Sequence, residues 1–571
     1  MGQWDLVGLS GVSAMHATLI PNTNKIVFLE KVEKSTNAVQ KEDPSLFSWS
    51  VEYDIDTASF RSLHTSTNMF CSAGGYRPDG TIVSLGGAEA QARAAEGWNS
   101  LRFLSACKAT PDSKCDWDIR ADLTLKAGRW YPTVETLADG RLFILGGSTR
   151  GASMNSKEIG VPSWELYPPM SSNPTHFQFL LDTLPYNLYP MAHLLPDGNL
   201  FIFANKQAVL FSTKTWKITK YLPELPGPPR NYPLSGGSVI LPLRPENNYE
   251  PEILICGGAT DFNSHATGQD SCGRIKPLSK DPDWVMEDMP LGRMMPDMTL
   301  LPDGTVLILN GANRGTAGYG RAKDPVLQPV LYRPWDDAPT KDDKASSRFK
   351  VQSPSYIPRL YHSIALPVLD GRVIVTGSNP NANTLLTSDF PVEYRVEMFS
   401  PGYLFSETPR PILRVDQTIN KAVQRPGADL TFQTAQNQKL DPERGQGGVK
   451  EAHENLIEFD TEFDVEVEFF GENMTEEQVK TVRGSGSSSP SRVQVHLLNS
   501  GFVTHSTHMS HRLVGLEVVG YTPSSERGAM DKLKVRGPKD GALTPPGWYQ
   551  MTVVENGVPS EGVWVHLQAR Q

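Results

Sequence analysis

Arg77-Pro78-Asp79-Gly80 opens the stretch that decides the fold of this 571-residue chain, and Thr81-Ile82-Val83-Ser84-Leu85-Gly86-Gly87 completes it. Apolar residues surround an Asp-Gly pair, and the alternating run after it ends in Gly-Gly. The phrase predicts a β-hairpin, because the tight turn needs a positive φ that glycine adopts without steric cost. Similar phrases recur at residues 138–147, 196–198, 302–304 and 369–371.

Two degenerate copies near residues 15–30 and 235–258 bring the number of repeats to seven, with Asn24 or a longer loop in place of the tight turn. A period of ~50 to 65 residues that contains such hairpins and few helical patterns is typical of kelch-type propeller blades. We therefore predict an all-β chain in which residues 1–405 form a seven-bladed kelch-type β-propeller. The alternative is a β-sandwich built from unrelated hairpins.

The repeat ends near residue 405, where Pro401-Gly402-Tyr403 and the proline-rich residues 408–411 mark a domain boundary. Short alternating runs follow at residues 463–470 and 493–498. They predict that residues 406–571 form an immunoglobulin-like β-sandwich domain. The polar residues 341–350 and 484–491 are expected to be surface loops.

The composition describes an acidic globular protein, 39% hydrophobic and 21% charged, with a net charge of -10. This balance argues against a nucleic acid or an anionic membrane as partner, because both reward lysine and arginine. No apolar run reaches the ~18 residues of a membrane-spanning helix. The start of the chain reads as a mature form, so we expect a secreted, extracellular protein, which the glycosylation sequon at Asn473 weakly supports. A monomer is expected.

Five cysteines leave one without a local partner. In an extracellular protein, the simplest interpretation pairs Cys107 with Cys115 and Cys256 with Cys272. Cys71 is then single, and a lone thiol in an oxidising compartment reacts unless it is buried or already committed to another bond. Cys71 therefore needs an explanation.

The repeats also predict which side chains meet. Cys71, Tyr131, Tyr189, Met295 and His362 each stand eight residues before the aspartate of their turn. If the blades are pseudo-symmetric, residues at this offset on the innermost strands line the central channel at similar height. Cys71 and Tyr131 belong to successive blades and should be neighbours.

Two further patterns contain metal-binding side chains. Tyr361 and His362 are adjacent, so both can reach one metal only where the backbone departs from a regular strand, as the nearby Pro358 would allow. The second pattern places His505, His508 and His511 at a spacing of three. On local sequence alone, a structural Tyr-His pair and a solvated histidine loop remain open.

Four motifs carry a resemblance over essentially the whole chain: residues 70–74 around Cys71, 128–133 around Tyr131, 359–363 around Tyr361-His362, and 501–505 ending in His505. With these motifs in this order, the chain resembles the copper radical oxidases, the family of galactose oxidase and glyoxal oxidase. Residues 184–190 and 293–296 look like the fungal glyoxal oxidase branch.

The resemblance implies a site with one copper ion. Tyr131, Tyr361, His362 and His505 would be the ligands, and His508 and His511 would not. It also implies that Cys71 is joined to the ring of Tyr131 by a thioether, which forms a protein-derived radical cofactor. Tyr361 would act as general base, and Tyr131 as the radical that removes hydrogen from the substrate carbon.

General chemistry agrees with this set. Imidazole and oxygen donors suit Cu(II), whereas structural zinc favours a closed shell of cysteine and histidine. Oxidation of an aldehyde hydrate releases two electrons, so copper needs a second redox centre, and the sequence has no dinucleotide-binding fingerprint.

The resemblance has one gap. In galactose oxidases a tryptophan covers the cross-link at the position that is Thr149 in this chain. This difference argues against galactose as substrate. It does not tell which residue shields the radical. Trp130 is expected to face into its blade and pack between sheets.

We therefore expect a glyoxal oxidase-like enzyme that oxidises small aldehydes such as glyoxal or methylglyoxal, as hydrates, to carboxylic acids while O2 is reduced to H2O2. An extracellular peroxidase is an expected consumer of the peroxide. One alternative is a copper radical alcohol oxidase that acts on glycerol or other primary alcohols. The other is a kelch propeller that binds protein or glycan without a metal.

Overall fold

A computed structural model describes residues 1–32, 49–91, 93–106, 115–336, 348–382, 388–415, 455–469, 493–524 and 530–569. Strands dominate these residues, and helix is confined to single turns at α2 (Phe179–Asp182), η1 (Pro245–Asn247) and η2 (Gly402–Phe405). None of the described helices is long and apolar enough to span a membrane. The prediction of an all-β chain is confirmed.

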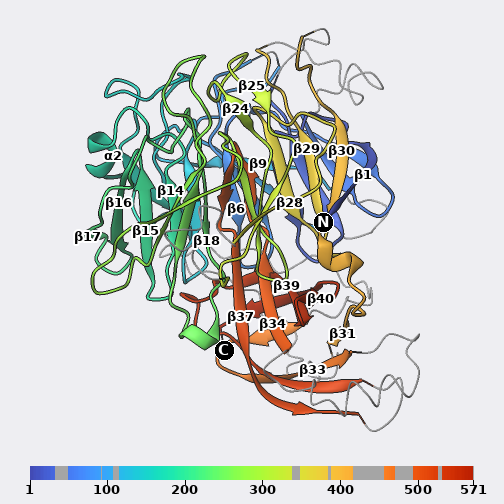
Figure 1. Cartoon of the computed structure of the whole chain (residues 1–571). Coiled ribbons are helices and arrows are strands. Elements are labelled where there is room, and N and C mark those ends of the chain that lie inside the picture. The colour runs from blue at the N-terminus through green and yellow to red at the C-terminus, as the bar shows by residue number, and fades with distance from the viewer. Residues whose placement is uncertain are drawn as a thin grey trace.

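Seven antiparallel sheets surround one axis and form the blades of a propeller (Figure 1). In five of the sheets the first two strands flank an Asp-Gly turn of the repeat. In chain order the blades are β2(His16–Ile20)-β3(Lys25–Leu29)-β4(Ser50–Asp54)-β5(Ser59–Leu63), β6(Ala73–Tyr76)-β7(Ile82–Leu85)-β8(Ser100–Leu104)-β9(Asp118–Thr124), β10(Thr133–Thr136)-β11(Leu142–Leu145)-β12(Ser163–Tyr167)-β13(Thr175–His176), β14(Met191–Leu194)-β15(Asn199–Ala204)-β16(Gln207–Ser212)-β17(Lys217–Tyr221), β18(Gly237–Ile240)-β19(Ile253–Cys256)-β20(Ser271–Ile275)-β21(Val285–Asp288), β22(Asp297–Leu300)-β23(Val306–Leu309)-β26(Val330–Tyr332)-β27(Phe349–Val351), and β28(Ser363–Pro367)-β29(Val373–Gly377)-β30(Arg395–Ser400)-β1(Gln3–Leu9).

The last blade closes the ring with the first strand of the chain. β1 pairs antiparallel with β30, so the two ends of the propeller sequence meet in one sheet. A small hairpin of β24 (Ala312–Arg314) and β25 (Lys323–Pro325) stands apart from the blades. Closure of this kind leaves no open edge between the first and last blades.

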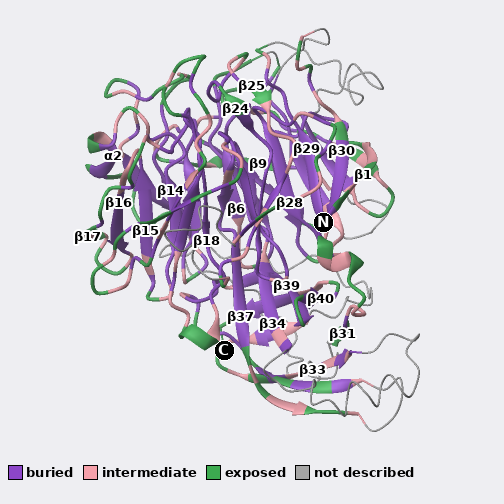
Figure 2. Ribbon diagram, viewed as in Figure 1, coloured by how far each residue is buried: buried purple, intermediate pink, exposed green. Residues whose placement is uncertain are grey.

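Apolar side chains fill the space between blades. The strands of the propeller are mostly buried, as the purple ribbons of Figure 2 show, while exposed residues gather on the outermost strands and connecting loops. The innermost and second strands of each blade are buried along nearly their whole length, for example β11 and β23. Because both faces of a blade pack against neighbours, second strands such as β11 and β23 are continuously apolar rather than alternating.

The C-terminal residues form a β-sandwich at one end of the propeller (Figure 1). Its strands run in the order β31(Ile412–Val415)-β33(Glu462–Glu468)-β38(Asp531–Arg536)-β37(Arg512–Thr522)-β34(Val493–Asn499)-β39(Gly547–Glu555)-β41(Val563–Gln568)-β32(Leu456–Glu458), and β40 (Val558–Pro559) pairs with β39. The long β37 pairs with β34 through residues 512–516 and with β38 through residues 517–522. One strand therefore belongs to both layers. The division into residues 1–405 and 406–571 stays a prediction.

One predicted disulfide joins Cys256 and Cys272, which face each other on β19 and β20. Cys115 is also disulfide-bonded, and its predicted partner Cys107 lies outside the described residues. Cys71 is buried and forms no disulfide. Asn473, residues 484–491 and most of the predicted loop 341–350 also lie outside the described part of the chain.

Candidate metal centre

The five residues at the repeated offset lie just before the innermost strands of their blades, not on them as expected. Cys71, Tyr131, Tyr189, Met295 and His362 all have φ between 47° and 68°. This left-handed conformation is uncommon for residues other than glycine, and it turns the side chain away from the strand that follows. The same irregularity lets the adjacent Tyr361 and His362 face one site, where their rings stack with centroids 3.7 Å apart.

Backbone hydrogen bonds join these turns around the channel. The amide of Tyr131 donates to the carbonyl of Cys71 at 3.1 Å, and the amide of Tyr189 donates to the carbonyl of Tyr131 at 3.0 Å. The predicted neighbours Cys71 and Tyr131 are therefore held together by main-chain contacts as well as by the blade order.

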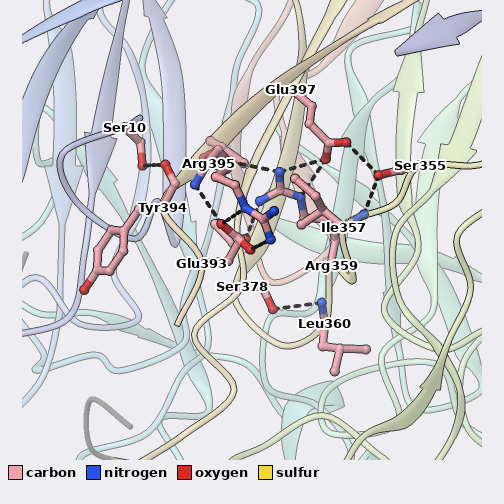
Figure 3. A network of polar contacts seen from close by, with 12 residues as sticks. Ser10, Ser355, Ile357, Arg359, Leu360, Ser378, Glu393, Tyr394, Arg395 and Glu397 are labelled. Atoms are coloured by element: carbon pink, nitrogen blue, oxygen red, sulfur yellow. Dashed lines mark hydrogen bonds and ion pairs between the residues drawn. The ribbon is translucent and has the colours of Figure 1, made fainter. Parts of the chain in front are cut away.

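Buried arginines fix the segments that carry the site. Arg359 forms an ion pair with Glu397 at 2.8 Å (Figure 3). It also donates to the carbonyl of Gly377 at 2.8 Å. The amide of Leu360 donates to Ser378 in the same network (Figure 3). Because both charges are almost fully buried and well bonded, the backbone just before Tyr361 has little freedom.

Arg129 has the same role in the segment that precedes Tyr131. It pairs with Glu165 at 2.8 Å and donates to the carbonyl of Gly146 at 2.7 Å. Two blades that contribute tyrosines to the site are thus anchored by the same kind of network.

His505 reaches the site on a hairpin that enters the propeller from the sandwich. β35 (Phe502–Thr504) pairs with β2, and the hairpin it forms with β36 (Thr507–Met509) contacts the innermost strands β2, β6, β10, β18, β22 and β28. Gly74 on β6 permits this approach, because a Cβ there would lie 2.4 Å from the ring of Phe502. The hairpin therefore fills the channel.

The tip of this hairpin is conformationally costly. Thr504 pairs with Thr507, so His505 and Ser506 are the two turn residues, with φ of 49° and 65°. Such turns favour Asn-Gly, and each bulkier residue held there costs on the order of 1–3 kcal/mol. Strain of this kind is commonly found where a side chain serves a function.

All five predicted site residues meet at the end of the channel. The Oη atoms of Tyr131 and Tyr361 are 2.6 Å apart, and Sγ of Cys71 lies 3.4 Å from Nε2 of His505. The possible ligand atoms of Cys71, His362 and His505 all lie within 4.8 Å of one another. Each of the five side chains is at most 7% exposed.

The imidazoles are arranged to bind a cation as neutral groups. Nδ1 of His362 donates to the carbonyl of Asn379 at 3.0 Å, which leaves Nε2 unprotonated, and that atom is buried without a hydrogen-bond partner. Burial lowers the pKa of both His362 and His505 well below the ordinary value. A histidine fixed through one nitrogen to a carbonyl, with the other nitrogen bare, is the usual form of a metal ligand. The donor set fits copper.

Burial has the opposite effect on the pKa of the acidic groups of the site, the two phenols and the thiol. It raises the pKa of Tyr131, Tyr361 and Cys71 well above their ordinary values. Both phenols are therefore neutral in the bare protein at physiological pH, and a bound dication would be needed to hold them as phenolates.

Tyr232 was not singled out from the sequence. Its ring stacks on that of Tyr131, with centroids 4.5 Å apart and an interplanar angle of 25°, and its Oη lies 3.2 Å from Oη of Tyr361. It comes from the loop before β18, the blade whose degenerate repeat has no Asp-Gly turn to count from. Tyr232 thus covers one face of the Tyr131 ring. Thr149, at the position of the galactose oxidase tryptophan, has no bulky side chain that could do so.

The expectation that Trp130 packs between sheets, away from the site, is wrong. Its ring meets that of Tyr131 edge to face at 3.9 Å and that of Phe70 at 6.0 Å. The alternation of a strand does not apply to this residue, because β10 begins only at Thr133 and Tyr131 has a positive φ.

The other two histidines of the cluster have protein partners. Nε2 of His508 pairs with Asp297 at 3.0 Å, and Nε2 of His511 accepts from the amide of Leu300 at 2.7 Å. Both therefore contact β22 of the propeller, whereas His505 faces the tyrosines.

Comparisons with known proteins agree with this geometry. The sequence-family model of the glyoxal oxidase N-terminus matches residues 15–403. The family model of the galactose oxidase-like Early set domain matches residues 454–567. The aldehyde oxidase GLOX of Vitis pseudoreticulata is 35% identical, with 99% of this chain and 97% of the relative covered.

The chain belongs to the glyoxal oxidase family. The expected resemblance to copper radical oxidases is confirmed, and membership of this enzyme family argues against the metal-free binding module. The aldehyde oxidase GLOX1 of Arabidopsis thaliana is 34% identical over 99% of this chain and 84% of its own length. A copper-bound fungal alcohol oxidase of the AA5 family shares the fold, with a TM-score of 0.69 at 15% identity and 99% of both chains covered.

Proposed function

We propose that this glyoxal oxidase family member is a secreted, monomeric oxidase of small aldehydes. It would convert glyoxal- or methylglyoxal-type aldehydes, as their hydrates, to carboxylic acids and reduce O2 to H2O2. A peroxidase would be the natural consumer of the peroxide. The observation that carries the proposal is the meeting of two phenols, two neutral imidazoles and a lone buried thiol at the end of the channel.

In this proposal Tyr131, Tyr361, His362 and His505 hold one copper ion, and Cys71 is joined to the ring of Tyr131 by a thioether. The bare Nε2 of His362 and the neutral state of His505 support imidazole ligation. When bound, the copper and the linked Tyr131 would take up the two electrons that oxidation of the hydrate releases, and O2 would carry them away as peroxide.

The chain's own side chains would perform the remaining tasks. As the phenolate that a bound dication would stabilise, Tyr361 would accept the proton of the substrate hydroxyl as general base, with its Oη 2.6 Å from that of Tyr131. Tyr232 would hold Tyr361 in place through its own hydroxyl. Burial of the whole group would keep bulk water from the reacting atoms.

The aromatic surroundings of the site support a small substrate. The rings of Phe70 and Tyr319 stack with centroids 6.5 Å apart, and Tyr319 meets Tyr361 and His362 edge to face at 5.6 and 5.7 Å. A two- or three-carbon aldehyde hydrate needs less room than a hexose. The alternative, oxidation of glycerol or another primary alcohol, stays open, since the copper-bound alcohol oxidase shares only the fold.

The test is peroxide release by the copper-loaded chain with methylglyoxal, glycerol and galactose side by side. We expect the highest kcat/KM with methylglyoxal, and a higher value with glycerol would favour the alcohol oxidase. Intact mass after copper loading in air should fall by two further hydrogen atoms, beyond the loss from the disulfides, and Cys71→Ser should abolish this difference. Separate Cys71 and Tyr131 in the active protein would refute the proposed cofactor.

A further inference from the structure

A cavity lies where the propeller meets the sandwich. The segment between β18 and η1 pairs with β37 there, since the amide of Leu243 donates to the carbonyl of Leu513 at 3.0 Å and the amide of Gly515 donates to the carbonyl of Leu243 at 2.8 Å. Beside this pairing, residues of η1, β34 and β37 line a cavity of about 260 Å³. One water molecule needs about 10–15 Å³, so the cavity has room for a small organic molecule.

The side chain of His496, in the wall of this cavity, lacks one hydrogen-bond partner. It is 2% exposed, and its Nδ1 lies 2.7 Å from the carbonyl oxygen of Pro302, so Nδ1 carries the proton and Nε2 is an acceptor. Burial lowers the pKa of His496, which keeps the ring neutral at physiological pH. Nε2 has no hydrogen-bond partner among the described residues. A buried acceptor in this state is costly, so the cavity favours a ligand that donates a hydrogen bond.

Gln494 offers both a donor and an acceptor to the same cavity. It stands two residues before His496 on β34, so the two side chains leave the same face of the sheet. Within the described ranges the Gln494 amide makes no hydrogen bond to the protein. Together the amide and the imidazole can bind a group that both donates and accepts, as a hydroxyl does.

The charged groups at the cavity balance one another. Nε of Arg244, on the propeller side, lies 3.9 Å from a carboxylate oxygen of Glu246, and Glu517 of β37 pairs with Arg536 at 3.0 Å. The Arg244 guanidinium makes no hydrogen bond to any residue that the structure describes, so its N–H groups can donate to a ligand. Because neither sign of charge is in excess, the cavity favours a neutral ligand over an anion or a cation.

An exposed aromatic ring extends the site beyond Arg244. The guanidinium of Arg244 lies 5.2 Å from the ring centroid of Trp335, which is 44% exposed. These two residues also line a second hollow of about 130 Å³. Arg244 therefore stands between a polar cavity and an aromatic one. A sugar ring has hydroxyls at its edge and C–H groups on its faces, so it suits polar groups and an aromatic ring alike.

We propose that the two hollows on either side of Arg244 bind a neutral oligosaccharide, with one sugar unit against His496 and Gln494 and the next against Trp335. The site shares no residue with the candidate metal centre. Its role is to attach the protein to a glycan, and the bound sugar is not oxidised. The inference does not depend on the proposed function, because this binding needs neither copper nor turnover.

The test is calorimetric titration of the copper-loaded chain with cellobiose, maltose and N,N′-diacetylchitobiose, with glucose and inorganic phosphate alongside. We expect at least one disaccharide to bind about 10-fold or more tightly than glucose, because the second sugar unit adds the contact with the indole ring. Trp335→Ala should weaken that binding by about 10-fold. Gln494→Ala should weaken it by about 3- to 10-fold, the worth of a hydrogen bond. Tyr221→Ala removes a 64% exposed ring from β17 and is the matched control, with no change expected.

His496→Asn tests the buried end of the site. The asparagine amide can still donate to the carbonyl of Pro302 but has no counterpart of Nε2, so the affinity for the disaccharide should fall by about 3- to 10-fold. If this variant does not fold, Trp335→Ala and Gln494→Ala, at side chains that are not fully buried, decide the question.

Four outcomes would overturn the inference. The first is that none of the three disaccharides binds. The second is binding of phosphate without any disaccharide, which would indicate an anion site at Arg244. Equal affinity in wild type, Trp335→Ala and Gln494→Ala would place the sugar elsewhere on the surface. Competition between the disaccharide and methylglyoxal in the peroxide assay would place it at the metal centre. Disaccharide binding without peroxide release from any substrate would instead refute the proposed function alone.

Discussion

The two ends of the hairpin in the channel differ in how their histidines are satisfied. At the base, His508 faces the carboxylate of Asp297, and both side chains are 1% exposed. At the tip, three residues earlier, His505 faces the sulfur of Cys71 and the imidazole of His362, and the charges that act on it come from His362 and His16. One short segment thus holds one imidazole paired with a buried carboxylate and one whose ring nitrogens contact a hydroxyl, that of Thr504, and the thiol of Cys71. The difference supports the proposal that His508 is structural and that His505 binds the metal.

The base of the hairpin anchors it to several blades. Glu135 of β10 accepts from the amides of Ser510 and Leu194, and Ser510 bonds Thr136 at 3.0 Å. The position of His505 therefore depends on polar contacts that are remote from the site. Substitutions at the tip should change chemistry, and substitutions at the base should change stability.

The largest effect is expected at the tip. His505→Ala should lower copper affinity by more than about 100-fold, beyond what the loss of a supporting group causes, and should abolish peroxide release. The melting temperature should fall by a few degrees, because alanine keeps the left-handed turn but removes a buried ring that contacts those of Tyr131 and Tyr361. Copper titration, the peroxide assay and thermal unfolding measure these three quantities. A variant that binds copper as tightly as wild type would contradict the ligand role.

The next effect is expected at the base. Asp297→Ala leaves His508 and the amide of Asn310 without their partner in a dry interior. Breaking a buried pair in this way costs about 3–5 kcal/mol of unfolding free energy. Urea unfolding measures the loss, and Asp324→Ala, which removes an exposed partner of Arg314, is the matched control with an expected loss below about 1 kcal/mol.

The Asp297→Ala variant also allows a prediction about copper binding. Folded Asp297→Ala should still bind copper through the same side chains, so its spectrum should resemble that of wild type. Loss of the metal without loss of stability would reverse the proposed roles of tip and base.

The third effect concerns pH. Burial raises the pKa of Glu135 from 4.5 to about 7, although Arg512 opposes the shift. Between these values the folded chain keeps a proton that the unfolded chain has released, so the unfolding free energy falls as pH rises through this window. The shift corresponds to about 3 kcal/mol.

Glu135→Gln isolates this contribution, because glutamine is neutral at every pH and similar in shape. Urea unfolding at about pH 5 and about pH 8 should show a falling stability difference between wild type and variant. A difference that stays constant across the window would mean that Glu135 is ionised throughout.

Much of the propeller could be predicted from the sequence, because Asp-Gly hairpins are local and repeat. The pairing of β1 with β30 and the entry of the β35–β36 hairpin could not, since both join segments that are far apart in the chain. Local patterns say nothing of such partners, which are chosen by the closure of the ring and the shape of the channel.

The residues of the site also divide into those that the repeat pattern predicted and those that it could not. Cys71, Tyr131 and His362 share one offset, so repeat symmetry predicted that they would meet. His505 belongs to no blade and was assigned only through the family resemblance. Tyr232 comes from a degenerate repeat, where no offset can be counted. Side chains from irregular segments are placed by tertiary packing, which periodicity does not encode.

The smallest effect is expected at Tyr232. Its substitution tests whether a residue that is not a proposed metal ligand contributes to the reactivity of the site. Tyr232→Phe removes the hydroxyl 3.2 Å from Tyr361 but keeps the ring on Tyr131. The loss of one hydrogen bond predicts a decrease in kcat/KM of about 3- to 10-fold with little change in copper affinity. Tyr232→Leu also removes the ring, so the oxidised form of Tyr131 should decay faster, as followed by its optical absorption. Tyr356→Phe, at a side chain that is 91% exposed, is the control and should match wild type. If Tyr232→Leu kept the wild-type lifetime, the stacked ring would have no protective role, and Trp130, edge-on to Tyr131, would be the next residue to test.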